Sequence, residues 1–347
     1  MTLHYADLNI TFSIIIVTWN GLHHLKKFLP SVTESEYDHF EVIIADNASD
    51  DGTVEWVQKN YPNCKTVTFD QNYGYAGGNN RAVKYADGDV LIFLNNDVET
   101  ASDWLQHLDN AFREQNADIL QPKIKSLKEK EYFEYAGAAG GYIDWLGYPF
   151  CRGRIFQHVE KDESQYDIPA EIFWASGAAL AVKKDLFLSA GGFDEAFEFH
   201  MEEIDLCWRC HKQGATIMVE PKSVVYHLGG GSLDKSDPRK AFYNYRNSLL
   251  MLTKNLDTFL FPKIFFRLIL DGISGIRSLV SGKPMETFAI IKSHFSFYSM
   301  LAGALEKRKI LTEKSIHPSP IHLIHQRLII SETFLRGKKK YSDLADS

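Results

Sequence analysis

Cysteine is scarce in this sequence, which holds 4 Cys in 347 residues. That number is too small for a disulfide scaffold, so we expect a protein of a reducing compartment. Long uncharged apolar runs are also missing, because charged residues interrupt the two most apolar stretches, 259–280 and 288–305. Neither reaches the roughly 18 uncharged residues of a membrane-spanning helix. The first residues lack the basic start and apolar core of a signal peptide. We therefore expect a cytoplasmic protein without a spanning helix.

Glycine-rich nucleotide loops and internal repeats are absent as well. The pair Gly77-Gly78 lacks the Gly-x-Gly-x-x-Gly spacing that opens a dinucleotide-binding fold, so a Rossmann dehydrogenase is not expected. What the sequence does have is apolar material: 45% of its residues are hydrophobic and 13% are aromatic, enough for a sizeable core. A chain of this length is expected to form one full domain with an appendage.

Charge is divided unevenly along the chain. Residues 239–347 hold 18 Lys and Arg against 8 Asp and Glu, a net charge of +10, whereas residues 1–238 hold 20 against 37, a net charge of −17. An acidic body is thus joined to a basic segment. Such a segment can meet nucleic acid, a membrane surface or the acidic body itself.

The first 123 residues alternate between short apolar runs and helical patterns. Continuously apolar strands joined by helices are typical of a mostly parallel sheet covered on both faces, which binds ligands at the carboxyl ends of its strands. The expected strands are 12–18, 40–45, 65–69, 90–94 and 119–121, and the expected helices are 22–35, 53–60, 75–86 and 104–115. Residues 131–170 are rich in Gly and aromatic residues and are expected to form loops or short hairpins that could make a substrate wall.

Polar clusters fall at three of these strand ends. They are Thr18-Trp19-Asn20, the run 46–52 and Asn95-Asn96-Asp97. One nucleotide-sized site could collect all three, and a divalent cation could bridge the Asp97 carboxylate to phosphate oxygens. The plain alternative is a turn that closes the strand. Asp46 and Asp50 at the neighbouring end weaken that alternative, because carboxylates repel unless a cation or donor lies between them.

Seven motifs follow one another between about residue 11 and residue 255. They are FSIIIVTWN, VIIADNASDDGT, NYGYAGGNNRA, LIFLNNDVE, WASGAALAV, GGFDEAFEFHMEEIDLCWR and VVYHLGGGS. This order resembles the bacterial family-2 glycosyltransferases, and within them the rhamnosyltransferase-like branch that builds cell-surface polysaccharide. The resemblance implies an α/β GT-A fold, a nucleotide-diphosphate sugar donor, a divalent metal (Mg²⁺ or Mn²⁺) and inversion at the anomeric carbon.

The resemblance also divides the chain into regions. A catalytic domain over 1–238 would comprise a nucleotide-binding half, 1–123, and an acceptor-binding half, 124–238. A C-terminal helical extension of two or three amphipathic helices is expected over 239–315, followed by a basic tail over 316–347.

The resemblance implies a set of donor-nucleotide contacts. The Asp46 carboxylate would accept a hydrogen bond from the N3–H of a uracil or thymine base, and Thr18 would line the same pocket. The full expected set is Thr18, Asn20, Asp46, Asn47, Asp50, Asn80 and Asn96.

Two residues are expected to reach the metal. Asp97 matches the last position of the family's Asp-x-Asp motif, and His227 matches a late histidine that reaches the metal or the diphosphate in several relatives. Asn95 stands at the first position of the motif, which removes one formal charge. The alternative for His227 is a strand-end histidine bonded to the backbone.

The catalytic hypothesis rests on Glu202 and Glu203. In an inverting transfer an acceptor hydroxyl displaces the nucleotide diphosphate directly, and one carboxylate takes the hydroxyl proton. Relatives carry Glu-Asp here; Glu203 stands at the place of the proposed base, and Glu202 would orient the acceptor hydroxyl. Asp205 and Arg209, four residues apart, are expected to hold the helix. The alternative is a solvated acidic helix start, favoured by the helix dipole.

The acceptor side is expected to use four further residues. Trp174 could stack on a sugar, although a buried Trp is the commoner outcome. Arg246 could contact the diphosphate or an acceptor phosphate, with helix packing as the alternative. The expected acceptor and phosphate set is Trp174, Ser176, Gly177 and Arg246. Cys207 and Cys210 lack a second pair at zinc-site spacing and are expected to be reduced helix cysteines.

The sequence therefore predicts an inverting glycosyltransferase that moves a sugar, with L-rhamnose from dTDP-rhamnose as the first candidate, onto a lipid-linked or growing polysaccharide. The alternatives are a UDP-hexose donor, a non-catalytic nucleotide-sugar or polysaccharide-binding protein, and an enzyme of nucleotide-sugar activation. The basic C-terminal helices, with Phe265 and Phe266 beside Lys263 and Arg267, are expected to meet the anionic inner face of the membrane peripherally. Nucleic acid is not expected as a partner, and a homodimer is left open.

Overall fold

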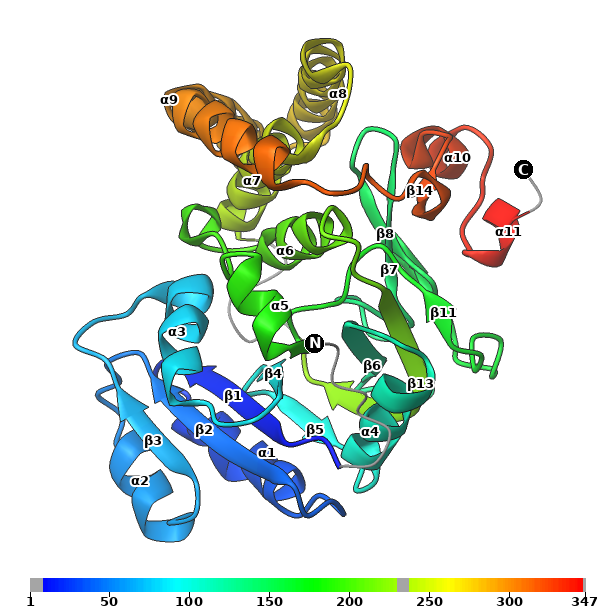
Figure 1. Cartoon of the computed structure of the whole chain (residues 1–347). Coiled ribbons are helices and arrows are strands. Elements are labelled where there is room, and N and C mark those ends of the chain that lie inside the picture. Colours follow the sequence, from blue (N-terminus) through cyan, green and yellow to red (C-terminus); the bar gives the residue numbers. More distant parts are fainter. Residues whose placement is uncertain (1–8, 230–236, 346–347) are drawn as a thin grey trace.

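A mixed central sheet with helices on both faces carries a group of C-terminal helices at one end (Figure 1). The computed structural model describes residues 9–229 and 237–345. The order of the strands is β11-β13-β6-β12-β4-β1-β2-β3, and β5 pairs with β13 beside this row. The bounds are β1 (Phe12–Thr18), β2 (Phe40–Asp46), β3 (Lys65–Thr68), β4 (Val90–Leu94), β5 (Val98–Thr100), β6 (Ile119–Ser126), β11 (Ala170–Glu171), β12 (Ala179–Lys183) and β13 (Ile217–His227).

Strand directions follow the expected parallel pattern only in part. The pairs β1–β2, β1–β4, β2–β3 and β6–β13 are parallel, whereas β12 is antiparallel to both β4 and β6. After β6 the chain builds a second sheet at the carboxyl end of that strand. It then re-enters the central sheet from the same end, which makes β12 antiparallel. The α/β class is confirmed, with a mixed sheet in place of a mostly parallel one.

Successive residues of β1 and β2 point to opposite faces of the sheet. Ile15 and Ile43 belong to one hydrophobic cluster, and Ile14 and Ile44 belong to the other, as the two-residue period of a strand requires. The helices are α1 (Leu22–Thr33), α2 (Thr53–Asn60), α3 (Gly74–Ala82), α4 (Trp104–Glu114), α5 (Lys184–Ser189) and α6 (Glu202–His211), with 3-10 turns at Val83–Tyr85, Glu195–Phe197 and Ile321–Leu323.

The C-terminal segment completes a small second sheet. Its order is β10 (His158–Val159), β9 (Arg154–Ile155), β8 (Pro149–Cys151), β7 (Gly141–Asp144) and β14 (Ile324–His325). Asp144 is buried and accepts a hydrogen bond from Ile329 N at 2.9 Å. Two short helices follow, α10 (Ile329–Phe334) and α11 (Ser342–Ala345). The segment expected as a basic tail is therefore folded onto the acceptor-side sheet.

Three helices form the C-terminal extension, in agreement with the sequence pattern. They are α7 (Pro238–Asn255), α8 (Leu260–Val280) and α9 (Pro284–Lys314). α7 packs against α6 and α9, and α9 also packs against α8. No helix within the described residues combines the length and the apolar character needed to cross a bilayer.

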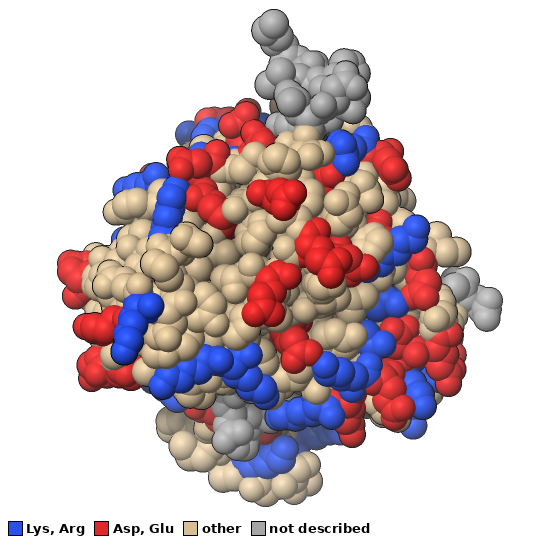
Figure 2. Space-filling model, turned by 90° about the horizontal axis from the view of Figure 1, so that it is seen from below, with Lys and Arg blue, Asp and Glu red and all other residues tan. Residues whose placement is uncertain are grey.

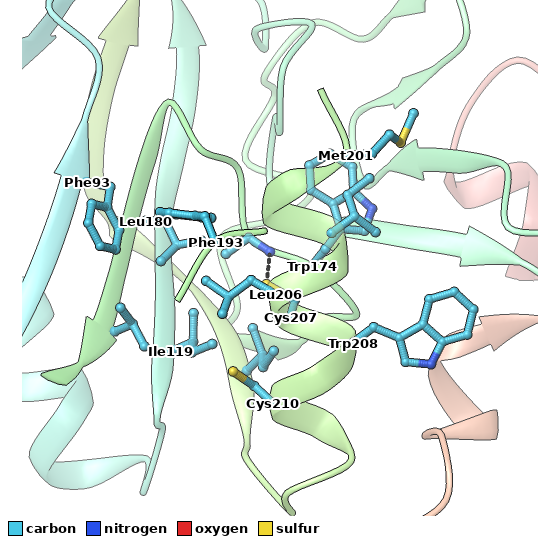
Figure 3. Packing of buried hydrophobic residues seen from close by; sticks show 14 of the residues in the cluster. Phe93, Ile119, Trp174, Leu180, Phe193, Met201, Leu206, Cys207, Trp208 and Cys210 are labelled. Atoms are coloured by element: carbon cyan, nitrogen blue, oxygen red, sulfur yellow. Dashed lines mark hydrogen bonds between the residues drawn. The ribbon is translucent and has the colours of Figure 1, made fainter. Parts of the chain in front are cut away.

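The two cysteines of α6 lie inside the core beside Trp208 and Leu206 (Figure 3). The Sγ of Cys207 accepts a hydrogen bond from Ala175 N at 3.4 Å. Burial raises the pKa of the Cys210 thiol to about 12, so the thiol stays neutral at physiological pH. These are core thiols, as expected for reduced helix cysteines rather than zinc ligands.

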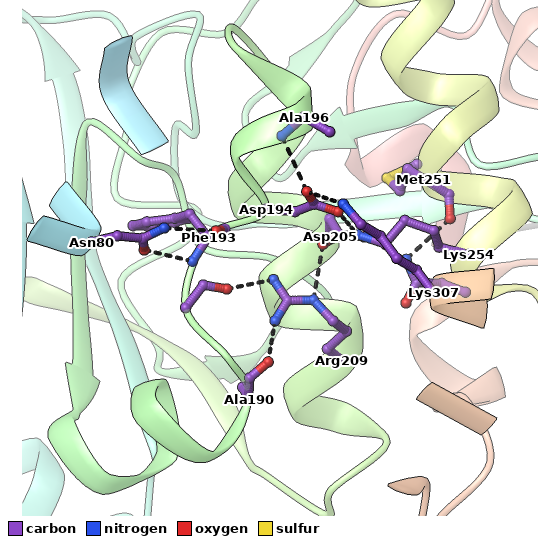
Figure 4. Close-up of polar contacts among 12 residues, drawn as sticks. Asn80, Ala190, Phe193, Asp194, Ala196, Asp205, Arg209, Met251, Lys254 and Lys307 are labelled. Carbon is purple, nitrogen blue, oxygen red and sulfur yellow. Dashed lines mark hydrogen bonds and ion pairs between the residues drawn. The ribbon is translucent and has the colours of Figure 1, made fainter. Parts of the chain in front are cut away.

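Part of the basic segment pairs with the acidic body. The Nζ of Lys254 lies 2.6 Å from Asp194 Oδ2 and 2.8 Å from Asp205 Oδ1, and the Nζ of Lys307 lies 2.6 Å from Asp194 Oδ1 (Figure 4). Elsewhere Asp and Glu are interspersed with Lys and Arg, as Figure 2 shows for the face seen from below. The opposite net charges of the two parts of the chain therefore contribute to holding them together.

Replacement of Lys254 by Ala should destabilise the fold strongly. The change leaves the buried carboxylate of Asp205 with fewer counter-charges, and removing one partner of a buried pair costs about 3–5 kcal/mol. Urea unfolding followed by circular dichroism measures the change. Lys307→Ala is the matched control: it removes an exposed cation from the same Asp194 carboxylate and should cost less than about 1 kcal/mol. Equal losses in the two variants would contradict the assignment.

Candidate active site

Asp46 ends β2 with one carboxylate oxygen satisfied and the other free. Its Oδ2 accepts a hydrogen bond from Ser49 N at 3.0 Å. Its Oδ1 is buried and has no hydrogen-bond partner in the described part of the chain. Because buried polar atoms are nearly always paired, this oxygen is placed to accept from a ligand. An N–H on the edge of a base has the required chemistry.

The neighbouring strand ends hold each other in place. Asn96 Nδ2 donates to Thr18 Oγ1 at 2.9 Å, between the ends of β4 and β1. Asn20 Oδ1 accepts from Asp50 N at 2.9 Å. A Cβ at position 21 would lie 2.2 Å from Thr18 Oγ1, so only glycine fits at Gly21. The three polar clusters expected at strand ends are therefore brought together.

Two residues expected to contact the donor bind the backbone. Asn47 Nδ2 donates to Gly74 O at 3.0 Å. Asn80 exchanges two hydrogen bonds with Phe193, at 2.8 Å and 2.9 Å. Their amides hold α3 against β2 and against the loop that follows α5, which gives both side chains a structural role; their donor contacts stay predictions.

Asp97 and His227 form the centre of a buried polar cluster. His227 Nε2 lies 3.1 Å from Asp97 Oδ1, and His227 Nδ1 lies 3.4 Å from Glu134 Oε2. Burial alone would lower the pKa of His227, but hydrogen bonding to Asp97 and Glu134 and the charges of both carboxylates raise it to about 10. The imidazole thus binds carboxylates, which rules out the backbone-bonded alternative. Glu134 lies in a Gly-rich stretch without a motif and was not expected.

A divalent cation could take the place of the proton that His227 shares with Asp97, because a ligating imidazole nitrogen carries no proton. Two ligands at right angles, each about 2.1 Å from an ion, lie about 3 Å apart, and the two side-chain atoms are separated by 3.1 Å. Asn95 Nδ2 lies 3.4 Å from the same His227 nitrogen, so a flipped amide would present its oxygen there. Within residues 9–229 and 237–345, no group of three or more His, Cys, Asp or Glu is arranged to hold an ion unaided. The remaining ligands would come from substrate oxygens or water.

The two glutamates at the start of α6 are buried without partners for part of their carboxylates. The Oε2 atoms of Glu202 and Glu203 have no hydrogen-bond partner among the described residues. Burial raises the pKa of Glu203 to about 7, and burial together with the charge of Glu203 raises the pKa of Glu202 well above its usual value. Glu202 is 7% exposed, whereas Glu203 is partly accessible. The solvated helix start is therefore excluded, and Glu203 is placed to exchange a proton with a ligand.

Tyr75 joins α3 to the segment that pairs with the end of β4. Asn95 N donates to Ala178 O at 3.0 Å, and Tyr75 Oη donates to the adjacent Gly177 O at 2.7 Å. Burial and the charges of Glu202 and Glu203 raise the pKa of Tyr75 well above its usual value, so both carboxylates act on this hydroxyl electrostatically. Tyr75 was not expected as a site residue.

Trp174 and Ser176 are packing residues. Trp174 is 4% exposed, and its Nε1 donates to Tyr142 O at 3.0 Å. The Ser176 hydroxyl donates to Ala136 O at 2.7 Å. Because the Trp174 ring is enclosed between the two sheets, the expected sugar contact is replaced by a role in fixing the acceptor half.

The turn before α6 is strained and is held by α7. Glu198, His200 and Met201 have φ values of 56°, 65° and 74°, which L-residues rarely adopt. Asn247 Nδ2 lies within hydrogen-bond distance of three carbonyl oxygens of this turn, those of Phe197 and Phe199 at 2.6 Å and of His200 at 2.9 Å.

The Arg246 guanidinium is committed to the same turn. It donates to Phe197 O at 3.2 Å and pairs with Glu198 Oε1 at 3.2 Å, and the residue is 4% exposed. The expected phosphate contact is therefore replaced by support of the turn that positions Glu202 and Glu203.

The fold defines the structural class of the protein. A mixed α/β sheet with helices on both faces, in this arrangement, is a GT-A fold. Residues 13–172 match the family described as glycosyl transferase family 2. Residues 13–172 are a little under half of the chain, so this match, together with the relatives below, supports a glycosyltransferase that resembles this family, as the motifs led us to expect.

Two curated relatives show the extent of the match. The chain is 28% identical over 208 residues to the O-antigen biosynthesis protein RfbC of Myxococcus xanthus, covering 56% of this chain but only 15% of that protein. It is also 28% identical over 255 residues to the N-acetylglucosaminyl-diphospho-decaprenol L-rhamnosyltransferase of Mycobacterium tuberculosis, covering 69% of this chain and 83% of that enzyme.

Solved structures share the fold at low sequence identity. GalNAc-T7 with UDP, GalNAc and Mn²⁺ gives a TM-score of 0.58 at 17% identity, over 86% of this chain and 57% of that chain. S. aureus TarS 1-349 in complex with UDP-GlcNAc gives a TM-score of 0.54 at 15% identity, over 88% of this chain and 91% of that chain. A mannosyltransferase from Pyrobaculum calidifontis with GDP-Man and Mn²⁺ gives a TM-score of 0.52 at 13% identity, over 84% of this chain and 88% of that chain.

Activity should depend on the deprotonated form of Glu203. Because a base works only after losing its proton, kcat/KM should fall about tenfold per pH unit below pH 7, the pKa to which burial raises this carboxyl. Glu203→Gln should lose at least about 100-fold in kcat, and Glu203→Asp should retain part of the activity. Sugar transfer measured between pH 5 and 9 checks this. Unchanged transfer by Glu203→Gln would exclude the residue as the base.

Loss of the Asn247 amide should lower kcat more than it changes donor affinity. In Asn247→Ala the strained turn before α6 is released, so the glutamates are misplaced while the strand-end pocket is untouched; a misplacement of about 1 Å can cost 100-fold in rate. Steady-state kinetics give kcat and the donor KM. Asn60→Ala is the control, since that amide bonds only Trp56 O on the exposed face of α2. A change confined to the donor KM would argue against this role.

Proposed function

We propose that this glycosyltransferase moves a sugar from a nucleotide-diphosphate donor onto a lipid-linked or growing polysaccharide acceptor, with inversion. The first candidate donor is dTDP-L-rhamnose. The observation that carries the proposal is the pair of Glu202 and Glu203, each with a buried carboxylate oxygen that has no partner among the described residues. The rhamnosyltransferase named among the relatives supports the sugar and the kind of acceptor.

The residues divide the reaction between them. The acceptor oxygen attacks the anomeric carbon, its proton passes to Glu203, and the bond to the diphosphate oxygen breaks with its electron pair leaving on the diphosphate. Glu202, whose raised pKa keeps it protonated, donates to and orients the acceptor. Asp97 and His227 would hold Mg²⁺ or Mn²⁺, which neutralises charge on the departing diphosphate. Asp46 accepts from the base and Thr18 lines its pocket.

A UDP-hexose donor is the second candidate. Uracil and thymine present the same N3–H to a carboxylate such as Asp46, and two structural neighbours are described with UDP or UDP-GlcNAc. Nucleotide-sugar activation has less support, since the sequence lacks a glycine-rich phosphate loop. Cytoplasmic location and a homodimer stay predictions.

Nucleotide binding should stabilise the protein in a base-dependent way. A ligand at 100 times its Kd adds about 2.7 kcal/mol, which should raise Tm by several degrees. We expect this rise with dTDP and dTDP-rhamnose, and a further rise when Mn²⁺ or Mg²⁺ is added. Asp46→Asn should lose the nucleotide effect, and Asp97→Ala should lose only the metal-dependent part.

Differential scanning fluorimetry across dTDP, UDP, GDP and their sugars makes the measurement. Asp103→Asn, an exposed change at the start of α4, is the control and should behave as the unaltered protein. A rise with UDP alone would select the UDP-hexose donor, and no rise with any nucleotide diphosphate would overturn the proposed site.

A further inference from the structure

Helix α8 buries two charged side chains in its middle and exposes large apolar ones. Arg267 and Asp271 are 3% and 1% exposed. On the opposite side of the same helix, Phe265 and Ile276 are each 65% exposed and Val280 is 83% exposed. An amphipathic helix of a globular protein is oriented the other way. The sequence led us to expect Arg267 on the surface beside Phe265; the structure places it inside.

The buried charges have partners that fix this orientation. Arg267 Nη1 donates to Leu146 O at 3.0 Å, and the guanidinium lies 3.5 Å from the centre of the Tyr148 ring. Asp271 lies 3.3 Å from Arg267 Nε and 3.3 Å from His294 Nε2. Turning α8 to hide its apolar side would leave these charges without partners, so the exposed apolar side is a built feature of the fold.

Helix α9 extends the same kind of surface. Thr287 Oγ1 donates to Gly275 O at 2.8 Å, which joins the two helices near their connecting turn. Phe288 and Phe295 of α9 are 71% and 72% exposed. We call the exposed side chains of Phe265, Ile273, Ile276, Val280, Phe288 and Phe295 the apolar surface. Soluble proteins rarely expose so many large apolar side chains together unless the surface meets a partner.

The two helices also carry a net positive charge. Between residues 259 and 298 the inward pair Arg267–Asp271 cancels, which leaves Lys263, Arg277, Lys283 and Lys292 against Glu286. A second copy would bring the same excess of positive charge to the contact, whereas an anionic lipid headgroup layer would complement it.

We propose that the apolar surface of α8 and α9 docks into the interface of an anionic membrane. The helices lie in the plane of the bilayer, with the aromatic and aliphatic side chains among the upper acyl chains and the lysines near lipid phosphates. Docking does not require the donor or the acceptor of the proposed function. It would hold the transferase at the surface where a lipid-linked acceptor is embedded.

Vesicle flotation of the full chain tests the proposal without any substrate. We expect binding to vesicles of phosphatidylcholine with 40% phosphatidylglycerol at low salt, weaker binding at high salt, and at least about tenfold weaker binding to phosphatidylcholine alone. The variant Phe265→Ser/Phe288→Ser should lose binding at least about tenfold. Ile168→Ser is the matched control: Ile168 is 75% exposed but lies outside α8 and α9, and its loss should leave binding unchanged.

Two results would overturn the proposal. One is absence of binding to anionic vesicles by the unaltered chain. The other is a dimer in light scattering that Phe265→Ser/Phe288→Ser converts to a monomer, which would assign the apolar surface to a second copy. Donor hydrolysis, measured in the same variants without vesicles, should be unaffected. Loss of flotation with intact hydrolysis therefore separates a failure of docking from a failure of the proposed function.

Discussion

The carboxylate of Asp205 is the contact on which the active-site geometry depends. It lies in the first turn of α6, is completely buried, and accepts from Arg209 Nε at 2.9 Å and Asn255 Nδ2 at 2.7 Å in addition to its pair with Lys254. Arg209 in turn donates to the carbonyl oxygens of Ala190 and Gly192 (Figure 4). One buried anion thus ties α6 to the C-terminal helix α7 and, through Arg209, to the loop that follows α5. The basic C-terminal segment is therefore part of the catalytic unit and does more than extend it.

Carboxylates within one turn of α6 are held in opposite electrostatic states. Burial would raise the pKa of Asp205, but the charges of Lys254 and Arg209 outweigh it and keep the pKa below its usual value. Glu202 and Glu203 undergo the same burial without such compensation, and their pKa values rise. The neighbouring side chains alone therefore decide which carboxyl stays a fixed structural anion and which can accept a proton. The strained turn held by Asn247 sets where the uncompensated pair lies.

The sequence was sufficient where a pattern is local. The limits of β1 and the strand-end positions of Asp46 and Asp97 follow from apolar runs closed by polar residues. It was not sufficient where a side chain's partner comes from far along the chain. Trp174 and Arg246 have residue types that suit a ligand, yet their partners are backbone atoms of distant segments. The strand β14 is two residues long and forms by pairing with the edge of β7. A strand this short has no sequence period from which it could be predicted.

Near Asn95, where the chain departs from the family motif, a carboxylate again comes from a segment far along the chain. An Asp at that position would place a second carboxylate beside Asp97, on the adjoining strand end. In this chain the second carboxylate near His227 is Glu134, which reaches the other ring nitrogen from the acceptor half. The imidazole of His227 is therefore flanked by carboxylates from two different segments. Because Glu134 belongs to the loop between β6 and β7, the shape of the acceptor half becomes coupled to the place where the metal and diphosphate would bind.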